Sequence, residues 1–345
     1  MGRQLAVAPI LAIVLASCQA GPTAAPGETE AASPGAVASR PSALASPLAA
    51  VISIDQPTME ARYQAALPLF EYDSTAPLGL TKGPGREGFG IAIEEIGYVS
   101  PLGGTVTAYL LHPGAATRPR PGLIVMHGSG GSRSDLLREG TNYAQLGVLV
   151  LLIDGPSARR EGEWIDFTSR DREEQVQLIV DLRRAVDVLI DVGADPTRIG
   201  YLGYSYGAAM GGELAGVEPR IKAYALDVGD GGLVSHFTGP DDGGGNPDRV
   251  PAQQWADWVA LMEPIEPIYF IGHAAPAALL MQSARNDELI PIADAERWHA
   301  AASHPKEIRW YESGHGLPPQ AWCEQADWLR GHLEFSEGPF SPECG

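Results

Sequence analysis

Residues 199–210 read IGYLGYSYGAAM and contain the pattern Gly203-x-Ser205-x-Gly207. The apolar residues before this pattern predict a strand over 199–203, and the small residues after it predict a helix over 208–215. A serine in the tight turn between them would be exposed at the end of the strand, and the N-terminus of the helix would stabilise negative charge that develops there. A plain glycine turn is the alternative, so the rest of the chain must supply further evidence for a nucleophile.

Outward from this turn, the chain alternates between strand and helix patterns. Continuous apolar runs at 122–126 and 148–153 are typical of strands buried on both faces of a parallel sheet. We expect further strands at 223–227, 277–283 and 307–311 and an amphipathic helix at 171–192. Before these, we expect a short helix at 58–67, a Gly- and Pro-rich loop to about residue 90, and a hairpin of 91–99 with 105–111. The alternation predicts an α/β fold, with a mainly parallel central sheet covered by helices on both faces.

A second glycine-rich motif, His127-Gly-Ser-Gly-Gly131, follows the strand at 122–126. Glycines let backbone N–H groups approach a substrate oxygen, so we expect an oxyanion site made by the N–H groups of Tyr206 and Ser129, with Gly130 close behind. His127 itself is expected to fix the loop by hydrogen bonds. A phosphate-binding loop is the alternative, but no Lys-Ser/Thr follows the glycines.

A serine nucleophile needs a base and an acid that orients it. His315 lies in the motif Ser-Gly-His-Gly just past the last predicted strand, where a loop can carry an imidazole to the serine. The other histidines lie on predicted helices, in an early strand or in an insert, where His236 and His273 could at most line a pocket. Asp287, after the strand at 277–283, is the expected acid; Glu288 beside it, and Asp227 or Asp230 after the preceding strand, are the alternatives.

The composition excludes several classes of partner. The chain has 43 acidic and 24 basic residues and a formal net charge of −19, which disfavours nucleic acid and anionic lipid surfaces. None of the three cysteines lies at zinc-ligand spacing, so no metal site is expected.

The first 55 residues are not expected to belong to the folded domain. Arg3 and the apolar run 5–17 predict a signal peptide over 1–17, because the run is too short to span a bilayer. Leu15-Ala-Ser-Cys18 resembles the lipobox of bacterial lipoproteins, which implies an exported protein lipidated at Cys18; cleavage of an ordinary signal after Ala20 is the alternative. All but seven of residues 19–50 are Ala, Ser, Pro, Gly or Thr, so 18–55 is expected to be a flexible tether that anchors a domain at 56–345.

The glycine motifs, and the chain order Ser205, Asp287, His315, resemble those of the α/β-hydrolases over about residues 56–335. The dienelactone-hydrolase-like and acetyl-xylan-esterase-like branches are the most similar, although dienelactone hydrolases proper use a cysteine nucleophile. The resemblance implies hydrolysis of a small-molecule or polymer-derived carboxylic ester through an acyl-enzyme, without metal or cofactor. A serine peptidase of the prolyl-oligopeptidase type, normally built with a large N-terminal propeller, and a non-catalytic binding protein are the alternatives.

Residues 230–275 form an insert rich in Gly, Pro and Trp, which is either a helical cap over the pocket or a surface excursion. Within it, Asp241–Pro247 is expected to be a mobile loop.

With Cys18 set apart, Cys323 and Cys344 form an even pair in an oxidising compartment, and we expect a disulfide between them.

Overall fold

The computed structural model describes residues 55–345 apart from 89, 115–118, 239–249, 337 and 345. The predicted signal peptide, Cys18, nearly all of the predicted tether and the loop Asp241–Pro247 therefore lie outside the described residues. Within the described ranges, no helix combines the length and the apolar character needed to cross a membrane.

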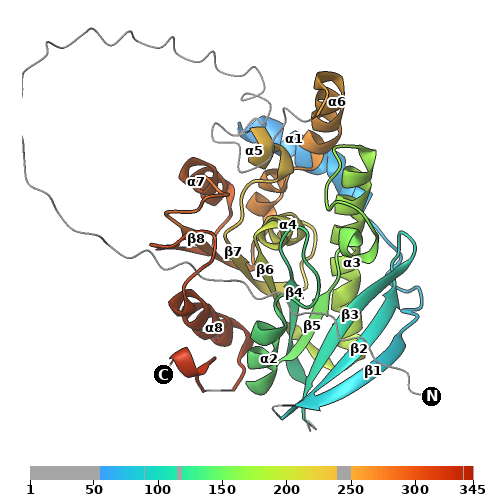
Figure 1. Cartoon of the computed structure of the whole chain (residues 1–345), viewed down its shortest axis with the longest axis vertical. Helices are drawn as coiled ribbons and strands as arrows, with labels where there is room; N and C mark the ends of the chain where they lie inside the picture. Colours follow the sequence, from blue (N-terminus) through green and yellow to red (C-terminus); the bar gives the residue numbers. More distant parts are fainter. Residues whose placement is uncertain (1–54, 89, 115–118, 239–249, 337, 345) are drawn as a thin grey trace, which may run out of the picture. The chain divides into compact units, whose positions relative to one another are not determined.

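A nine-stranded sheet forms the centre of the described part of the chain (Figure 1). Its strands, in chain order, are β1 (Thr81–Gly88), β2 (Ile91–Val99), β3 (Thr105–Pro113), β4 (Arg120–Met126), β5 (Leu149–Ile153), β6 (Ala194–Tyr204), β7 (Ile221–Asp227), β8 (Ala278–Ala284) and β9 (Lys306–Tyr311). The spatial order is β1-β2-β3-β5-β4-β6-β7-β8-β9. Along this spatial order, the neighbours from β1 as far as β5 pair antiparallel. The neighbours from β5 through β4 to β9 all pair in parallel, which confirms the mainly parallel sheet.

Both faces of the sheet are covered by helices. Successive side chains of a strand point to opposite faces, so a strand with only apolar residues needs a covering layer on each side. In β4, Ile124 and Met126 belong to one hydrophobic cluster, and Leu123 and Val125 belong to a second. The helices that supply the covering side chains are α1 (Gln56–Ala66), α2 (Leu137–Gln145), α3 (Ser169–Asp191), α4 (Tyr206–Ala215), α5 (Leu233–Thr238), α6 (Ala252–Met262), α7 (Ile292–Ala301) and α8 (Pro319–Leu333). Helices α3 and α4 pack into the first cluster, and α2 and α8 pack into the second.

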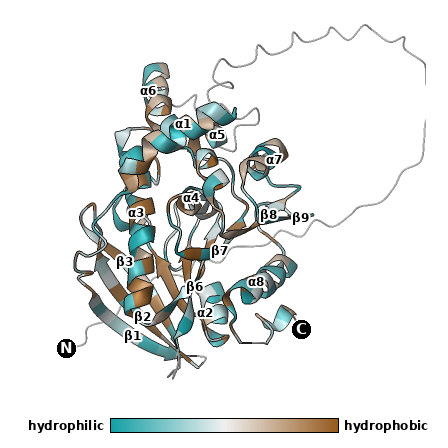
Figure 2. Ribbon diagram, turned by 180° about the vertical axis from the view of Figure 1, so that it is seen from behind, coloured by the Kyte–Doolittle hydropathy of each residue, from teal (hydrophilic) through white to brown (hydrophobic). Residues whose placement is uncertain are grey.

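One sequence prediction of the fold is wrong. Residues 81–88, expected to be part of a Gly- and Pro-rich loop, form the edge strand β1, which is almost entirely exposed and is largely hydrophilic in Figure 2. Its backbone pairs with β2, and the register shifts between Lys82 and Gly85, which accommodates Pro84. Pairing to a neighbour, rather than a buried side-chain pattern, creates this strand, so side-chain periodicity gave no signal for it.

The insert at 230–275 is largely helical in its described residues. It contains α5, α6 and the short 3₁₀ helices η5 (Glu263–Ile265), η6 (Pro267–Tyr269) and η7 (Ile271–His273). The two tryptophans of α6, Trp255 and Trp258, are buried and lie against Phe167, and Trp258 also donates a hydrogen bond from Nε1 to Asp171 Oδ2 at 2.8 Å. The insert is therefore anchored to α3 and to the loop that precedes it.

The C-terminal segment is joined to α8 by a disulfide between Cys323 and Cys344, with a Cα–Cα distance of 5.5 Å. This separation lies within the range that disulfides require, and it confirms the expected pairing.

Candidate active site

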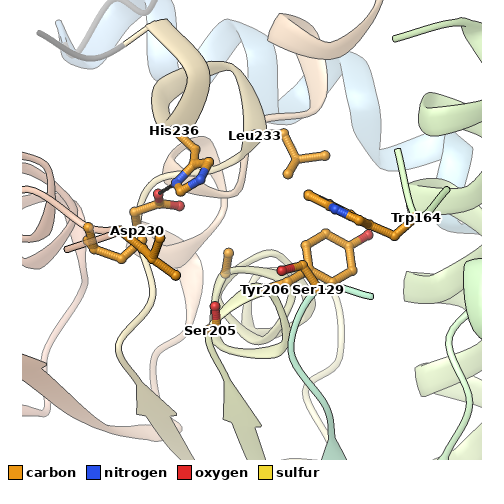
Figure 3. A pocket seen from close by; sticks show the side chains of 10 residues that line it. Ser129, Trp164, Ser205, Tyr206, Asp230, Leu233 and His236 are labelled. Carbon is orange, nitrogen blue, oxygen red and sulfur yellow. Dashed lines mark hydrogen bonds and ion pairs between the residues drawn. The ribbon is translucent and has the colours of Figure 1, made fainter. Parts of the chain in front are cut away.

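Ser205 lies at a sharp turn between β6 and α4, at the carboxyl end of the parallel sheet. Its backbone has φ 55° and ψ −117°, a conformation that is unfavourable for a residue with a side chain. The surrounding backbone holds it there: its N–H donates to the carbonyl of Asp227 at 2.8 Å, and its carbonyl accepts from the N–H groups of Ala208 and Ala209. The turn pushes the side chain of Ser205 out of the sheet toward the pocket (Figure 3).

The glycines on either side of Ser205 are required by close backbone contacts. A Cβ at Gly203 would clash with the carbonyl oxygen of Gly207. A Cβ at Gly207 would lie 2.5 Å from the carbonyl oxygen of Met126 and 2.7 Å from that of His127. The spacing of the motif thus follows from how tightly α4 approaches both β6 and the end of β4.

Replacing Gly207 by alanine is expected to lower the free energy of unfolding by roughly 3 kcal/mol, because the added methyl meets rigid backbone atoms. Urea unfolding followed by far-ultraviolet circular dichroism measures this change. Gly331→Ala in α8 is the matched control: nothing lies within 4 Å of its added Cβ, and alanine should raise stability there by about 0.5 kcal/mol. Equal stability of Gly207→Ala and the wild type would contradict the packing argument.

Three side chains from separate turns and loops, Ser205, His315 and Asp287, form one hydrogen-bonded row. His315, in the loop between β9 and α8, places Nε2 2.9 Å from Ser205 Oγ. Its Nδ1 lies 2.9 Å from both carboxylate oxygens of Asp287, which follows β8. A carboxylate only accepts hydrogen bonds, so Nδ1 carries the proton and Nε2 is left to accept the hydroxyl proton of Ser205.

Asp287 and Glu288, adjacent in sequence, have different contacts. Oδ1 of Asp287 accepts hydrogen bonds from the N–H groups of Leu289 and Ile290, which fix the carboxylate beneath the imidazole. Glu288 instead accepts from the backbone N–H of His315 at 3.0 Å, and this bond lowers the pKa of Glu288. The glutamate therefore holds the backbone of the histidine loop, and the aspartate holds the imidazole.

The two alternative acids have other partners. The side chain of Asp227 is fully buried, and each of its two carboxylate oxygens accepts a hydrogen bond from Gln325 Nε2 at 2.7 Å. Burial raises the pKa of Asp227 to about 7, and the hydrogen bond from Gln325 lowers it by a smaller amount. Asp230 is hydrogen-bonded to His236. The geometry therefore singles out Asp287 as the carboxylate that contacts His315.

The loop after β4 passes against the serine at Gly128. His127 is buried, its Nε2 accepts from the N–H of Gly155 at 3.1 Å, and its Nδ1 donates to the carbonyl of Gly128 at 2.7 Å. Burial lowers the pKa of His127, which favours this neutral, hydrogen-bonded form. A Cβ at Gly128 would stand 3.4 Å from that of Ser205, so glycine lets the loop pass against the nucleophile.

A cavity of about 50 Å³ opens beside Ser205 (Figure 3). It is lined by Ser129, Trp164, Ser205, Tyr206, Ala209, Asp230, Leu233, His236, Leu289 and Ile290. The lining includes the expected oxyanion residues Ser129 and Tyr206, whereas Gly130, at φ 64°, lies beside Trp164. A larger cavity of about 750 Å³ is bordered by β1 and α2, and its described lining residues are all different from those of the cavity beside Ser205.

Sequence reasoning missed the apolar part of the pocket wall. Trp164, Leu233 and the pair Leu289–Ile290 come from three loops or short helices far apart in the chain, and none carries a motif. Across the described ranges, no group of three or more His, Cys, Asp or Glu side chains is arranged to hold a metal ion.

No protein-family model matches the sequence. An acetyl xylan esterase from Paenibacillus sp. R4 superimposes with a TM-score of 0.66 at 19% identity, covering 83% of this chain and 98% of that one. Acetyl xylan esterase 1 from Thermoanaerobacterium sp. JW/SL YS485 gives a TM-score of 0.60 at 14% identity, covering 80% and 92%.

A sequence match is found to Esterase FrsA of Photorhabdus laumondii, 32% identical over 139 residues. It covers 39% of this chain and 32% of that protein, so the chain matches about a third of the length of this relative. The structural likeness extends over most of the described residues. The similar structures include an α/β hydrolase from Penicillium sp. sh18, which superimposes with a TM-score of 0.53 at 16% identity, covering 70% of this chain and 99% of that one. The chain therefore has the α/β-hydrolase fold that its motifs predict.

Proposed function

We propose that this protein is a serine hydrolase that cleaves carboxylic esters through an acyl-enzyme intermediate. The observation that carries the proposal is the continuous chain of 2.9 Å contacts from Ser205 Oγ through His315 to Asp287. A nucleophile, a base and an orienting acid in hydrogen-bond contact are the machinery that acyl transfer requires.

In this mechanism, Ser205 Oγ attacks the ester carbonyl carbon while His315 Nε2 accepts its proton. Asp287 keeps the imidazole in the right tautomer and stabilises its positive charge. The N–H groups of Tyr206 and Ser129, with Gly130 as the neighbouring donor, bind the oxyanion, and each such donor contributes on the order of 100-fold to the rate. His315 then returns the proton to the departing alcohol, and water activated by the same imidazole releases the acid.

The comparisons support an ester substrate. Two structural neighbours are named acetyl xylan esterases, and the matched segment of the sequence relative belongs to a protein named an esterase. A serine at position 205, rather than the cysteine of dienelactone hydrolases, also favours ordinary ester hydrolysis. We infer a small-molecule or polymer-derived ester as the substrate, with no cofactor taking part.

The direct test is an assay of p-nitrophenyl esters of increasing chain length beside proline-containing peptide amides. Preference for esters supports the proposal, and preference for the amides would support a peptidase of the prolyl-oligopeptidase type. Absence of hydrolysis of either class would contradict the proposal and favour a binding protein on this fold.

Trp164 is expected to limit the length of the acyl or alcohol group. Together with Tyr206 and Leu233 it lines both the 50 Å³ cavity and an adjoining cavity of about 10 Å³. Its ring lies against Tyr206 and Phe237, with centroids 5.8 and 6.3 Å apart. Trp164→Ala should join the two cavities and raise kcat/KM for p-nitrophenyl octanoate relative to acetate by roughly tenfold, because several more methylenes could be buried.

The matched control for this experiment is Trp328→Ala, which removes a tryptophan whose ring lies against His332 in α8, with centroids 4.3 Å apart. It should leave the chain-length profile as in the wild type. An identical profile for Trp164→Ala would show that Trp164 is not a wall of the substrate pocket.

We further propose that the protein is exported and held at the cell envelope by a lipid on Cys18, with residues 18–55 as the tether and 56–345 as the catalytic domain. The membrane contact would then be made by the lipid alone. The mature protein should begin at a diacylated Cys18, which mass spectrometry of its N-terminal peptide measures. A mature N-terminus beyond Cys18 would contradict the anchor without affecting the catalytic proposal.

A further inference from the structure

The pocket beside Ser205 contains a second histidine–aspartate pair that the mechanism does not use. His236, on α5, and Asp230, after β7, both line the cavity, and His236 Nδ1 lies 2.9 Å from Asp230 Oδ2. In Figure 3 the imidazole stands on the side of the pocket opposite Trp164, with Leu233 between the two in this view and Ser205 below. Of the described residues that line the cavity, this pair alone carries a carboxylate and an imidazole.

Folding alone does not account for the pair. Asp230 already accepts the N–H of Gly232 through Oδ1, at 3.1 Å, which is a common contact of a turn aspartate and needs no histidine. The side chain of Asp230 is 6% exposed and that of His236 is 18% exposed. Withdrawing two polar groups from water in this way is costly unless both are fully hydrogen-bonded, and the second ring nitrogen, Nε2, is left facing the pocket.

The state of the imidazole follows from its partner. Since the carboxylate of Asp230 can only accept, Nδ1 of His236 carries a proton in every state, and Nε2 is an acceptor when the ring is neutral and a donor when it is charged. Burial lowers the pKa of His236, but the hydrogen bond and charge of Asp230, with Asp294 on α7 and Glu266 between η5 and η6, raise it overall above its ordinary value. The charged state is therefore favoured more than in an ordinary histidine.

We propose that Nε2 of His236 binds a hydroxyl group of the substrate, close to the scissile ester, and so selects hydroxylated esters. A hydroxyl both donates and accepts, so it can pair with Nε2 in either protonation state. A carboxylate on the substrate would meet the negative charges of Asp230, Glu266 and Asp294, and a purely apolar group would leave Nε2 without a partner. The small cavity also leaves room for only a short group. This inference rests on the proposed ester hydrolysis at Ser205.

Two pairs of esters of nearly equal size test the proposal and distinguish the side of the ester that carries the hydroxyl. Ethyl hydroxyacetate against ethyl propionate probes the acyl side, and 2-hydroxyethyl acetate against propyl acetate probes the alcohol side. The kcat/KM ratio within each pair, measured by titrating the released acid, is compared between the wild type and the variants, so that differences in intrinsic reactivity cancel.

His236→Asn is the decisive variant, because its amide nitrogen can replace Nδ1 in the bond to Asp230 while no atom remains at the position of Nε2. In one of the two pairs, it should lower the kcat/KM of the hydroxylated ester relative to its apolar counterpart about tenfold, which is the effect of losing one good hydrogen bond. His236→Gln, whose amide reaches the position of Nε2, should retain much of the ratio. His332→Asn, on the outside of α8, is the control and should leave both ratios unchanged.

Ratios that are the same in His236→Asn and in the wild type for both pairs would overturn this inference while leaving the proposed function intact. So would a loss in His236→Gln that is as large as that in His236→Asn. Hydrolysis of p-nitrophenyl esters by the wild type, with none of these four esters hydrolysed, would overturn this inference alone. Failure of the wild type on the p-nitrophenyl esters as well would overturn the proposed function, and this inference with it.

Discussion

Replacing Ser205 by alanine is expected to lower kcat for ester hydrolysis by on the order of 10⁴-fold or more, because no other group can form the acyl-enzyme. The hydroxyl of Ser205 bonds to His315, and the strained backbone at Ser205 is held by backbone contacts that alanine preserves. The variant should therefore fold normally and still bind esters. Steady-state hydrolysis of p-nitrophenyl acetate measures the loss.

The matched control is Ser336→Ala, which removes a hydroxyl from an exposed position outside the pocket. It should hydrolyse the ester at the wild-type rate. Activity of Ser205→Ala above about one per cent of the wild type, well over what the oxyanion site alone leaves in a triad variant, would mean that Ser205 is not the nucleophile.

Replacing Asp287 by asparagine is expected to lower kcat by roughly 10³- to 10⁴-fold without loss of structure, because it changes the tautomer of the histidine. Oδ1 of this side chain accepts two backbone N–H groups, from Leu289 and Ile290. The asparagine oxygen would keep those bonds, so its NH₂ group would point at His315 Nδ1. The imidazole would then carry its proton on Nε2 and could no longer accept the proton of Ser205.

Asp227→Asn is the comparison that makes this test specific. It makes the same chemical change in a buried aspartate whose side chain bonds to Gln325. We expect its kcat to stay within a few-fold of the wild type in the same hydrolysis assay. An equal loss of activity in the two variants, or a normal rate in Asp287→Asn, would contradict the assignment of the acid.

The central strands could be predicted from sequence because each is buried on both faces. In β4 and β5, Leu123 to Met126 and Leu149 to Ile153 alternate between the two hydrophobic clusters, so every position is apolar and the run is plain in the sequence. The edge strand β1 has the opposite character. Its exposed side chains contribute nothing to the core, and its formation depends on hydrogen bonds to β2 that no local pattern records.

In the candidate site, too, some residues could be predicted from sequence and others could not. Ser205, Asp287 and His315 could be proposed because each follows a recognisable strand, and the carboxyl ends of parallel strands meet at one edge of the sheet. The walls of the pocket could be predicted only in part. His236 is expected at most to line a pocket, and it does, but nothing in the sequence points to Trp164. Trp164 reaches the cavity through the packing of the loop before α3 against the insert, which depends on contacts such as that of Trp258 with Asp171.

The measurement that bears most directly on the central claim is the site of covalent labelling by diisopropyl fluorophosphate. If Ser205 is the activated nucleophile, intact-protein mass spectrometry should show one adduct per chain, peptide mapping should place it on Ser205, and hydrolysis should fall in proportion to labelling. An adduct on another residue, or ester hydrolysis that continues after complete labelling of Ser205, would contradict the account.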